Sequence, residues 1–364
     1  MKAGIVGLPN VGKSTLFNCL SSAKAQSANY PFCTIEPNVG VISVPDQRLT
    51  KLAEIVNPQR VQAAIVEIVD IAGLVKGASK GEGLGNKFLG NIRETDAVIH
   101  VLRCFENDNI THVETSIDPV RDKEIIDFEL QLKDLESLDK RLEKVKRAAR
   151  TGDKVAQKEL DTLQKVKLGL ESAISVRAID LSEDERKEYI KPLQFLTDKP
   201  VLYVCNVDEA SATKGNKFVD AVIEAVNDED AEVLVLAVAT EADIAELDDY
   251  EEKELFLEEL GLEEAGAARL IKSAYKLLNL QTYFTAGEKE VRAWTIHIGD
   301  KAPQAAGVIH TDFEKGFIRA EVIKYDDFIH YGSEAKVKEA GKLSVEGKEY
   351  VVQDGDMMNF RFNV

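Results

Sequence analysis

Apolar residues in the first 120 residues, and again between residues 201 and 238, gather in short runs, separated by polar or helical segments. Such runs lie at Ala3–Val6, Ala64–Val69, Ala97–Leu102, Val201–Cys205 and Val233–Val238. Short, continuous apolar runs are typical of strands that are buried on both faces, and their alternation with helical segments predicts a mostly parallel sheet. The fold class predicted from this pattern is α/β, with helices on both faces of the sheet.

The pattern changes over residues 121–196, where no strand signal occurs and apolar residues recur at helical spacing. One stripe consists of Phe128, Leu132, Leu135, Leu138, Leu142 and Val145. A second stripe follows Gly152 and consists of Val155, Leu160, Leu163, Val166 and Leu170. These stripes predict two long helices that are joined near residues 151–153 and form an inserted antiparallel hairpin.

Residues 281–364 predict a small α+β unit. Strand-like segments lie at Val291–Ile298, Phe317–Ile323, Tyr350–Val352 and Met358–Phe362, with a short helix at Gln304–His310. An Asp-Gly turn signal separates the last two segments. The chain is therefore divided into residues 1–120 with 197–280, residues 121–196, and residues 281–364.

Composition restricts the class of protein. The 364 residues are 44% hydrophobic and carry a net charge of −18, which argues against a chain coated by nucleic acid. Cys19, Cys33, Cys104 and Cys205 are scattered, which is typical of reduced thiols in a cytoplasmic protein. The N-terminus shows no signal peptide, and no stretch is apolar enough for a membrane span.

The charge is distributed unevenly. Residues 241–264 contain twelve acidic residues and one lysine, whereas residues 140–158 contain eight basic and two acidic residues. The basic cluster falls at the predicted tip of the hairpin. Two interpretations stay open for it: a contact with RNA, or a solvated helix end.

Residues 7–15 read Gly-Leu-Pro-Asn-Val-Gly-Lys-Ser-Thr and fit the P-loop pattern without a mismatch. The segment follows a predicted strand and precedes a helical pattern, as a P-loop requires. Its backbone N–H groups can surround phosphates, with Lys13 reaching the β- and γ-phosphates and Ser14 offering a hydroxyl to Mg²⁺. The nucleotide-binding residues predicted here are Asn10, Val11, Gly12, Lys13, Ser14 and Thr15.

Two further segments complete the predicted phosphate site. Asp70 follows the Ala64–Val69 strand and can hold the Mg²⁺ shell, while the N–H of Gly73 can reach the γ-phosphate. Thr34 lies in a loop-like segment before that strand and can supply a second hydroxyl to Mg²⁺. The predicted metal ligands are therefore Ser14, Thr34 and Asp70.

Asn206-Val207-Asp208-Glu209 follows the Val201–Cys205 strand, where GTPases carry Asn-Lys-x-Asp. Glu209 replaces the aspartate that accepts two hydrogen bonds from guanine, and its longer side chain displaces the carboxylate. Asn206 can instead accept a hydrogen from the adenine amino group. These residues predict a preference for ATP over GTP; the alternative is that Glu209 points to solvent and backbone groups contact the base.

Taken together, these motifs resemble the YchF / Obg-like ATPase family over essentially the whole chain. The resemblance rests on the P-loop and on residues 29–38, 70–78, 103–107, 277–287 and 309–320. It implies an inserted helical coiled coil, a C-terminal β-grasp unit of the TGS type, slow ATP hydrolysis and association with ribosomes. One departure concerns Ala237-Val238-Ala239, where related GTPases carry Ser-Ala-Lys, so base contacts there would come from the backbone only.

The residue that orients the attacking water is less evident. Many GTPases use a glutamine after Asp-x-x-Gly, but this chain has Leu74, which cannot hydrogen-bond water. His112 follows the Ala97–Leu102 strand on the ligand side of the sheet, and the resemblance implies that a histidine there replaces the glutamine. The alternative is a surface histidine without a role. Asn10 matches a position at which some related GTPases bind K⁺.

The predicted function is an ATP-hydrolysing switch, a monomer that uses Mg²⁺, with Lys13, Gly73 and His112 as catalytic residues. Its predicted partner is the ribosome or its RNA. Two alternatives stay open: a GTPase of the same fold, and a nucleotide-bound RNA or protein adaptor whose hydrolysis is incidental.

Overall fold

The computed structural model describes residues 1–22, 38–71, 84–229, 231–247 and 249–363. By their contacts, residues 1–40 and 67–270 form one compact unit, and residues 41–66 and 271–364 form a second. The sequence pattern predicts a single part over residues 1–120, whereas residues 41–66 group with the C-terminal residues. The assignment of residues 121–196 to a domain of their own stays a prediction.

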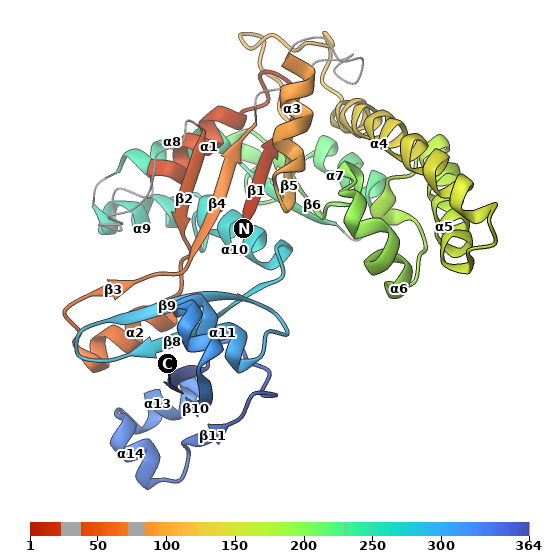
Figure 1. Cartoon of the computed structure of the whole chain (residues 1–364). Helices are drawn as coiled ribbons and strands as arrows, with labels where there is room; N and C mark the ends of the chain where they lie inside the picture. The colour runs from red at the N-terminus through yellow and green to blue at the C-terminus, as the bar shows by residue number, and fades with distance from the viewer. Residues whose placement is uncertain (23–37, 72–83, 230, 248, 364) are drawn as a thin grey trace. The chain divides into compact units, whose positions relative to one another are not determined.

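The first sheet has six strands in the order β2-β4-β1-β5-β6-β7 (Figure 1). Its strands are β1 Lys2–Val6, β2 Val39–Ser43, β4 Ile65–Asp70, β5 Ala97–Arg103, β6 Val201–Asn206 and β7 Glu232–Leu236. β1 pairs in parallel with β4 and β5, β5 with β6, and β6 with β7. The predicted α/β fold with a mostly parallel sheet is thereby confirmed.

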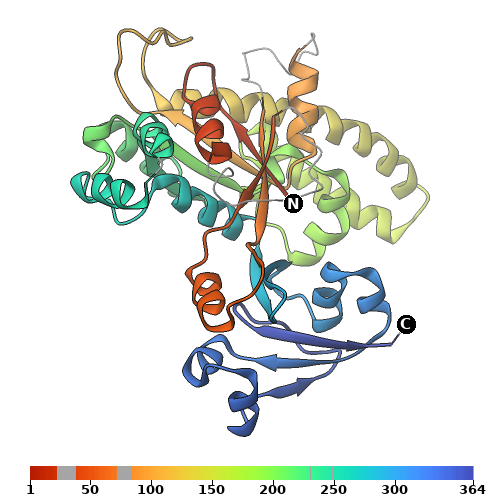
Figure 2. The same ribbon diagram turned by 90° about the vertical axis from the view of Figure 1, so that its left-hand side faces the viewer.

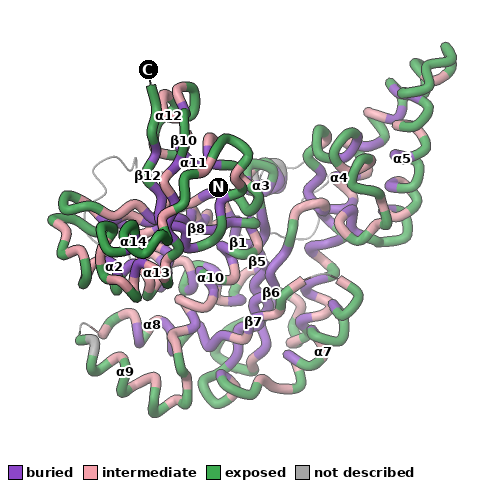
Figure 3. Tube along the Cα trace, turned by 90° about the horizontal axis from the view of Figure 1, so that it is seen from below, coloured by how far each residue is buried: buried purple, intermediate pink, exposed green. Residues whose placement is uncertain are grey.

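The central strands β5 and β6 are buried along their whole length, as continuous apolar runs require (Figure 3). The helices connected to this sheet are α1 Lys13–Ser22, α3 Leu84–Arg93, α7 Lys217–Ala225, α8 Val238–Glu246, α9 Tyr250–Glu259 and α10 Gly266–Leu277. None of the helices in the described ranges is long and apolar enough to cross a membrane.

A helical hairpin is inserted between β5 and β6. Helix α4 (Pro119–Ala149) begins at the N-cap Asp118, and helix α5 (Lys154–Glu171) begins at the N-cap Asp153. Between them Gly152 adopts a φ of 87°, a conformation that costs glycine little. Figures 1 and 2 show the two helices running side by side, away from the sheet.

The hairpin has an apolar core of its own. The buried residues of this core come from α4, from α5 and from the short helices that follow: Leu138, Leu142, Val145, Ala156, Leu163, Val166, Leu170, Val176, Ile190 and Phe195. These short segments are the 3₁₀ helices Val176–Ala178, Lys191–Leu193 and Leu196–Asp198, helix α6 (Glu183–Glu185) and the π-helical turn Arg186–Ile190.

Phe128 departs from the predicted apolar stripe, because 56% of its surface is exposed. The buried face of this part of α4 is formed by Ile126 and Leu130 instead. Phe128 lies two residues from each of them, which places it about 200° around the helix axis. The stripe that is correct from Leu138 onward is therefore wrong at Phe128.

The second unit contains a mixed sheet in the order β11-β10-β12-β8-β9-β3. Its strands are β3 Val61–Gln62, β8 Leu280–Ala286, β9 Val291–His297, β10 Phe317–Ile323, β11 Ser344–Glu346 and β12 Met357–Phe362. Its helices are α2 Gln47–Val56, α11 Ala302–Ile309, α12 Thr311–Lys315, α13 Tyr325–Tyr331 and α14 Glu334–Glu339.

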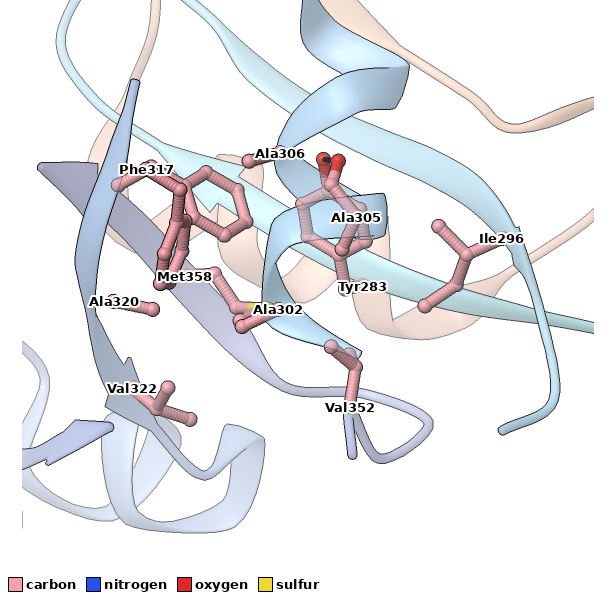
Figure 4. Close-up of a cluster of buried hydrophobic side chains, with 11 residues drawn as sticks. Tyr283, Ile296, Ala302, Ala305, Ala306, Phe317, Ala320, Val322, Val352 and Met358 are labelled. Carbon is pink, nitrogen blue, oxygen red and sulfur yellow. Dashed lines mark hydrogen bonds between the residues drawn. The ribbon is translucent and has the colours of Figure 1, made fainter. Parts of the chain in front are cut away.

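The core of this unit lies between α11 and the sheet. Ala302, Ala305 and Ala306 of α11 pack against Tyr283 and Met358 (Figure 4). The Tyr283 hydroxyl donates a hydrogen bond to the carbonyl of Ala305 at 2.9 Å, which satisfies the one polar group of this ring. An α+β unit is therefore confirmed, whereas its assignment to the TGS type stays a prediction.

One predicted strand of this unit is absent from the described residues. Residues 350–352 form no strand, and Val351 makes only an isolated bridge to Lys301. The predicted turn does occur at Asp354-Gly355, where Gly355 has a φ of 86°.

Candidate functional site

The P-loop connects β1 to α1, and two of its glycines are required by close packing. A Cβ atom at Gly7 would lie 2.5 Å from the carbonyl oxygen of Val101, and one at Gly12 would lie 2.4 Å from Asn206 Nδ2. Gly12 also has a φ of 100°, which side chains rarely adopt. The loop can therefore approach its neighbours, and a ligand, more closely than any other residues would allow.

Lys13 begins α1 and is almost completely buried, with 7% of its surface exposed. Its Nζ donates a hydrogen bond to the carbonyl of Leu8 at 2.7 Å, across the P-loop. Burial lowers the pKa of Lys13 to about 8, and the nearby carboxylate of Asp70 opposes this shift. A bound polyphosphate would favour the charged ammonium, so the site is suited to a strongly anionic ligand.

Ser14 and Asp70 come together at the end of β4. The Ser14 hydroxyl donates a hydrogen bond to Asp70 Oδ2 at 3.3 Å. Asp70 Oδ1 is buried and has no hydrogen-bond partner among the described residues. A hydroxyl beside a carboxylate with an unpaired oxygen is a hard-oxygen donor set, which fits Mg²⁺. The other predicted phosphate and metal residues, Gly73 and Thr34, lie outside the described residues.

Asn206, the last residue of β6, clamps the P-loop rather than facing an open pocket. Its Nδ2 donates a hydrogen bond to the carbonyl of Val11 at 2.9 Å, and its Oδ1 accepts one from the N–H of Val238 at 3.1 Å. Only 5% of its surface is exposed. The predicted contact between Asn206 Oδ1 and adenine is therefore not supported, because this buried oxygen already serves the backbone.

Replacing Asn206 by alanine should lower the free energy of unfolding. The change leaves the Val11 carbonyl and the Val238 N–H buried without partners, at a cost of about 2 kcal/mol. Chemical denaturation measures this loss, and Asn227→Ala, at an exposed position, is the matched control. Equal stability of the two variants would contradict the clamp.

The rest of the predicted base-binding segment divides into buried and exposed positions. Val207 is 3% exposed, and its N–H donates a hydrogen bond to the carbonyl of Leu236 at 2.9 Å. Asp208 caps the following turn through the N–H of Ser211, and Glu209 is exposed. The open alternative, in which Glu209 points to solvent, is the one that this arrangement favours.

The loop after β5 is organised by Arg103, whose role sequence reasoning missed. This fully buried guanidinium donates hydrogen bonds to the carbonyls of Phe105, Asn107 and Ile110, at distances of 2.9–3.2 Å. The sequence did contain a clue to this role, because an arginine at the end of a buried apolar strand needs hydrogen-bond acceptors nearby. The loop also contacts the P-loop, since Asn10 Nδ2 donates to the carbonyl of Thr111 at 3.1 Å.

His112 follows Thr111 directly and is 7% exposed. Its Nδ1 accepts a hydrogen bond from the N–H of Glu114 at 3.1 Å, so the ring proton is on Nε2. Nε2 lies 2.8 Å from Oδ2 of Asp122, in the first turn of α4. Arg121 donates to the other oxygen of Asp122 at 2.9 Å. His112 therefore follows the residue that contacts the P-loop in space and is engaged by α4, and because it is buried the alternative of a surface histidine is wrong.

Two family models match the chain. A model described as a 50S ribosome-binding GTPase matches residues 2–150. A second model, YchF-GTPase_C, which describes a protein of unknown function, matches residues 280–363. The first range includes the P-loop, and the second includes strands β8 to β12 of the second sheet.

Relatives match from end to end. The chain is 60% identical over 363 residues to a ribosome-binding ATPase, YchF of Pasteurella multocida, covering 100% of this chain and 99% of the relative. It is 55% identical to the protein of the same name from Bacillus subtilis, over 100% of both chains.

Solved structures give the same result. The Schizosaccharomyces pombe YchF GTPase is similar with a TM-score of 0.90 and 39% identity, over 99% of this chain and 97% of that one. A GTP-binding protein from Pyrococcus horikoshii has a TM-score of 0.62 at 21% identity over 100% of both chains, and this likeness shows the fold alone.

Proposed function

Because this chain belongs to the YchF family, we propose that it is an ATP-hydrolysing switch protein that associates with ribosomes in an ATP-dependent way. The main observation behind this proposal is the structure of the P-loop. Lys13 is buried there and bonds to the Leu8 carbonyl, and Asn206 bonds to the Val11 carbonyl of the same loop. The names of its bacterial relatives, which include both the ribosome and ATP hydrolysis, support the same function. Turnover of ATP with and without purified bacterial ribosomes tests it.

In this proposal Ser14, Thr34 and Asp70 hold Mg²⁺, which when bound neutralises charge on the phosphates. The pairing of Ser14 with Asp70 and the unpaired buried Oδ1 support the assignment for these two residues. Gly73 is proposed to donate its N–H to the γ-phosphate, and Lys13 to neutralise charge on the transferred group. Any K⁺ would be bound at Asn10, whose side chain contacts Thr111.

Replacing Asp70 by asparagine should raise the Mg²⁺ concentration needed for half-maximal hydrolysis by about 10-fold. The amide keeps one oxygen but removes the negative charge that attracts the ion. A titration of turnover against Mg²⁺ measures the shift, and Asp243→Asn, on the exposed side of α8, is the control. An unchanged Mg²⁺ requirement would remove Asp70 from the metal site.

The preference for ATP over GTP is proposed from the base-binding segment. The exposed carboxylate of Glu209, which forms no hydrogen bond among the described residues, lacks the fixed geometry with which a carboxylate accepts two guanine hydrogens. The N–H groups of Val207 and Val238 are already bonded to Leu236 and Asn206, so neither selects one purine over the other. The relatives' names differ on this point, since the fission-yeast structure is called a GTPase.

Competition between the two nucleotides decides this question. In an equilibrium assay with labelled ATP, we expect unlabelled ATP to displace the label at about 10-fold lower concentration than GTP. Equal or tighter binding of GTP would favour the alternative of a GTPase with the same fold.

The proposed contact with ribosomal RNA lies at the turn of the helical hairpin. Lys144, Lys146, Arg147, Arg150 and Lys154 are exposed there, and exposed cations are suited to phosphate groups. If ribosomes bound this chain equally well with and without ATP and did not change its turnover, the adaptor alternative would be favoured instead.

A further inference from the structure

A groove lies at the root of the helical hairpin, where α4 leaves the sheet. Its volume is about 610 Å³, and its walls come from α4, from the segment after α5 and from the end of α7. The apolar part of the lining is formed by Ile125, Phe128, Ile174, Ala178 and Ala225. All these residues belong to the first compact unit, so the groove is a feature of that unit alone.

The groove exposes large apolar side chains that are normally buried. Phe128 is 56% exposed and Ile174 is 44% exposed. Arg121, Glu124, Ile125 and Phe128 recur at the spacing of a single helix face, and this face of α4 lines the groove. Exposed large apolar residues that share one hollow, unlike those scattered singly, are typical of an interaction site.

The floor of the groove is held in place by hydrogen bonds. Gln131 Nε2 donates to the carbonyl of Ala173 at 3.1 Å and lies 3.3 Å from Ser175 Oγ, which ties α4 to the segment after α5. Lys123 Nζ lies 2.8 Å from Asp127 and 2.7 Å from Glu229. The groove is therefore preformed, and a ligand would not have to order its walls.

The charges around the groove favour a cationic ligand. Lys123 is neutralised by its two carboxylate partners, and Arg121 is engaged by Asp122. On the rim, Glu124 and Asp228 are exposed and form no ion pair among the described residues. An acidic rim of this kind repels the phosphates of RNA and attracts lysine or arginine.

We propose that this groove binds a basic polypeptide segment of a ribosomal protein, with one large apolar side chain seated between Phe128 and Ile174. The assignment rests on the proposed association with ribosomes. It divides the hairpin into two surfaces of opposite character: a cationic tip suited to RNA and an acidic, apolar root suited to protein. Glu124 and Asp228 would pair with cationic side chains on either side of the apolar anchor.

A photo-crosslinking experiment tests which component of the ribosome occupies the groove. The full chain carrying p-benzoylphenylalanine in place of Phe128 is mixed with purified bacterial ribosomes and ATP and is then irradiated. We expect a crosslinked product that resists ribonuclease, is degraded by protease and contains a basic ribosomal protein. A crosslink to RNA alone, or none while the protein co-sediments with ribosomes, would overturn the proposal.

Two pairs of variants measure what the groove contributes. Phe128→Ser should weaken co-sedimentation with ribosomes about 10-fold, because the exposed aromatic ring that contacts the ligand's apolar side chain is lost, whereas Leu168→Ser, at a site 67% exposed on α5, should not. Glu124→Lys should weaken it, and Glu254→Lys, at an exposed site on α9, should not.

The possible outcomes distinguish a failure of the groove assignment from a failure of the proposed ribosome association. If both groove variants bind ribosomes as tightly as their controls, the groove assignment fails and the ribosome association stands. If the parent protein does not co-sediment with ribosomes, the association fails and the ribosomal occupant fails with it.

Discussion

Replacing Lys13 by alanine should lower ATP turnover by about 10³-fold, because a buried ammonium that stabilises charge on the transferred phosphate is removed. The Nζ of Lys13 lies 2.7 Å from the Leu8 carbonyl and is shielded from water, which strengthens its interaction with any charge in the loop. Burial lowers the pKa of this group to about 8, so the protein bears a cost for placing it there. If Lys13 had only a structural role, it would not need to be charged, since a methionine of similar length would fill the same space.

The affinity for ATP should fall together with turnover. Isothermal titration measures binding, and single-turnover kinetics measures hydrolysis. Lys51→Ala, at an exposed position on α2, is the control for the loss of one positive charge. If the Lys13 variant bound ATP as tightly as the parent protein, the assignment of residues 7–15 to the phosphate site would have to be abandoned.

Replacing His112 by alanine should lower turnover by about 100-fold and leave ATP binding unchanged, if this ring orients the attacking water. In the structure both ring nitrogens are engaged, by the N–H of Glu114 and by Asp122. Because Nε2 carries the ring proton, the ring has to leave Asp122 before this N–H can donate a hydrogen bond to the attacking water. Because Asp122 belongs to α4, the position of the helical hairpin and the availability of His112 are connected.

A variant of the partner separates catalysis from structure. Asp122→Asn keeps the shape of the side chain and weakens its hold on the ring, so turnover should be retained or raised. His297→Ala, at a histidine with a 55% exposed side chain in the second unit, should have no effect. Unchanged turnover of the His112 variant would exclude this residue from the reaction, and a thermal melt of each variant shows whether the fold is intact.

Much of the fold follows from residue pattern. Continuous apolar runs predict β5 and β6 to within one residue, because strands buried on both faces carry mainly apolar side chains. The P-loop is predicted for a similar reason, since few sequences satisfy the need for glycine at both Gly7 and Gly12. Strand β3 is missed, because two residues carry no periodicity.

The errors arise where a long-range contact decides the outcome. Phe128 fits a helical stripe, yet the side of α4 that is buried is set by what packs against it. Asn206 follows the predicted strand as expected, but its hydrogen bonds to Val11 and Val238, which join three separate parts of the chain, replace the predicted contact with adenine. The contact of His112 with Asp122 cannot be inferred either, because it depends on where helix α4 begins.

The fit between Gly12 and Asn206 restricts how this sequence can drift over evolutionary time. Any side chain at position 12 would collide with the amide, and any residue without an amide at position 206 would leave two buried groups unmatched. Neither position can change alone without loss, so single substitutions at both are expected to be purged by selection. Gly12 and Asn206, although far apart in the chain, are therefore expected to be retained together.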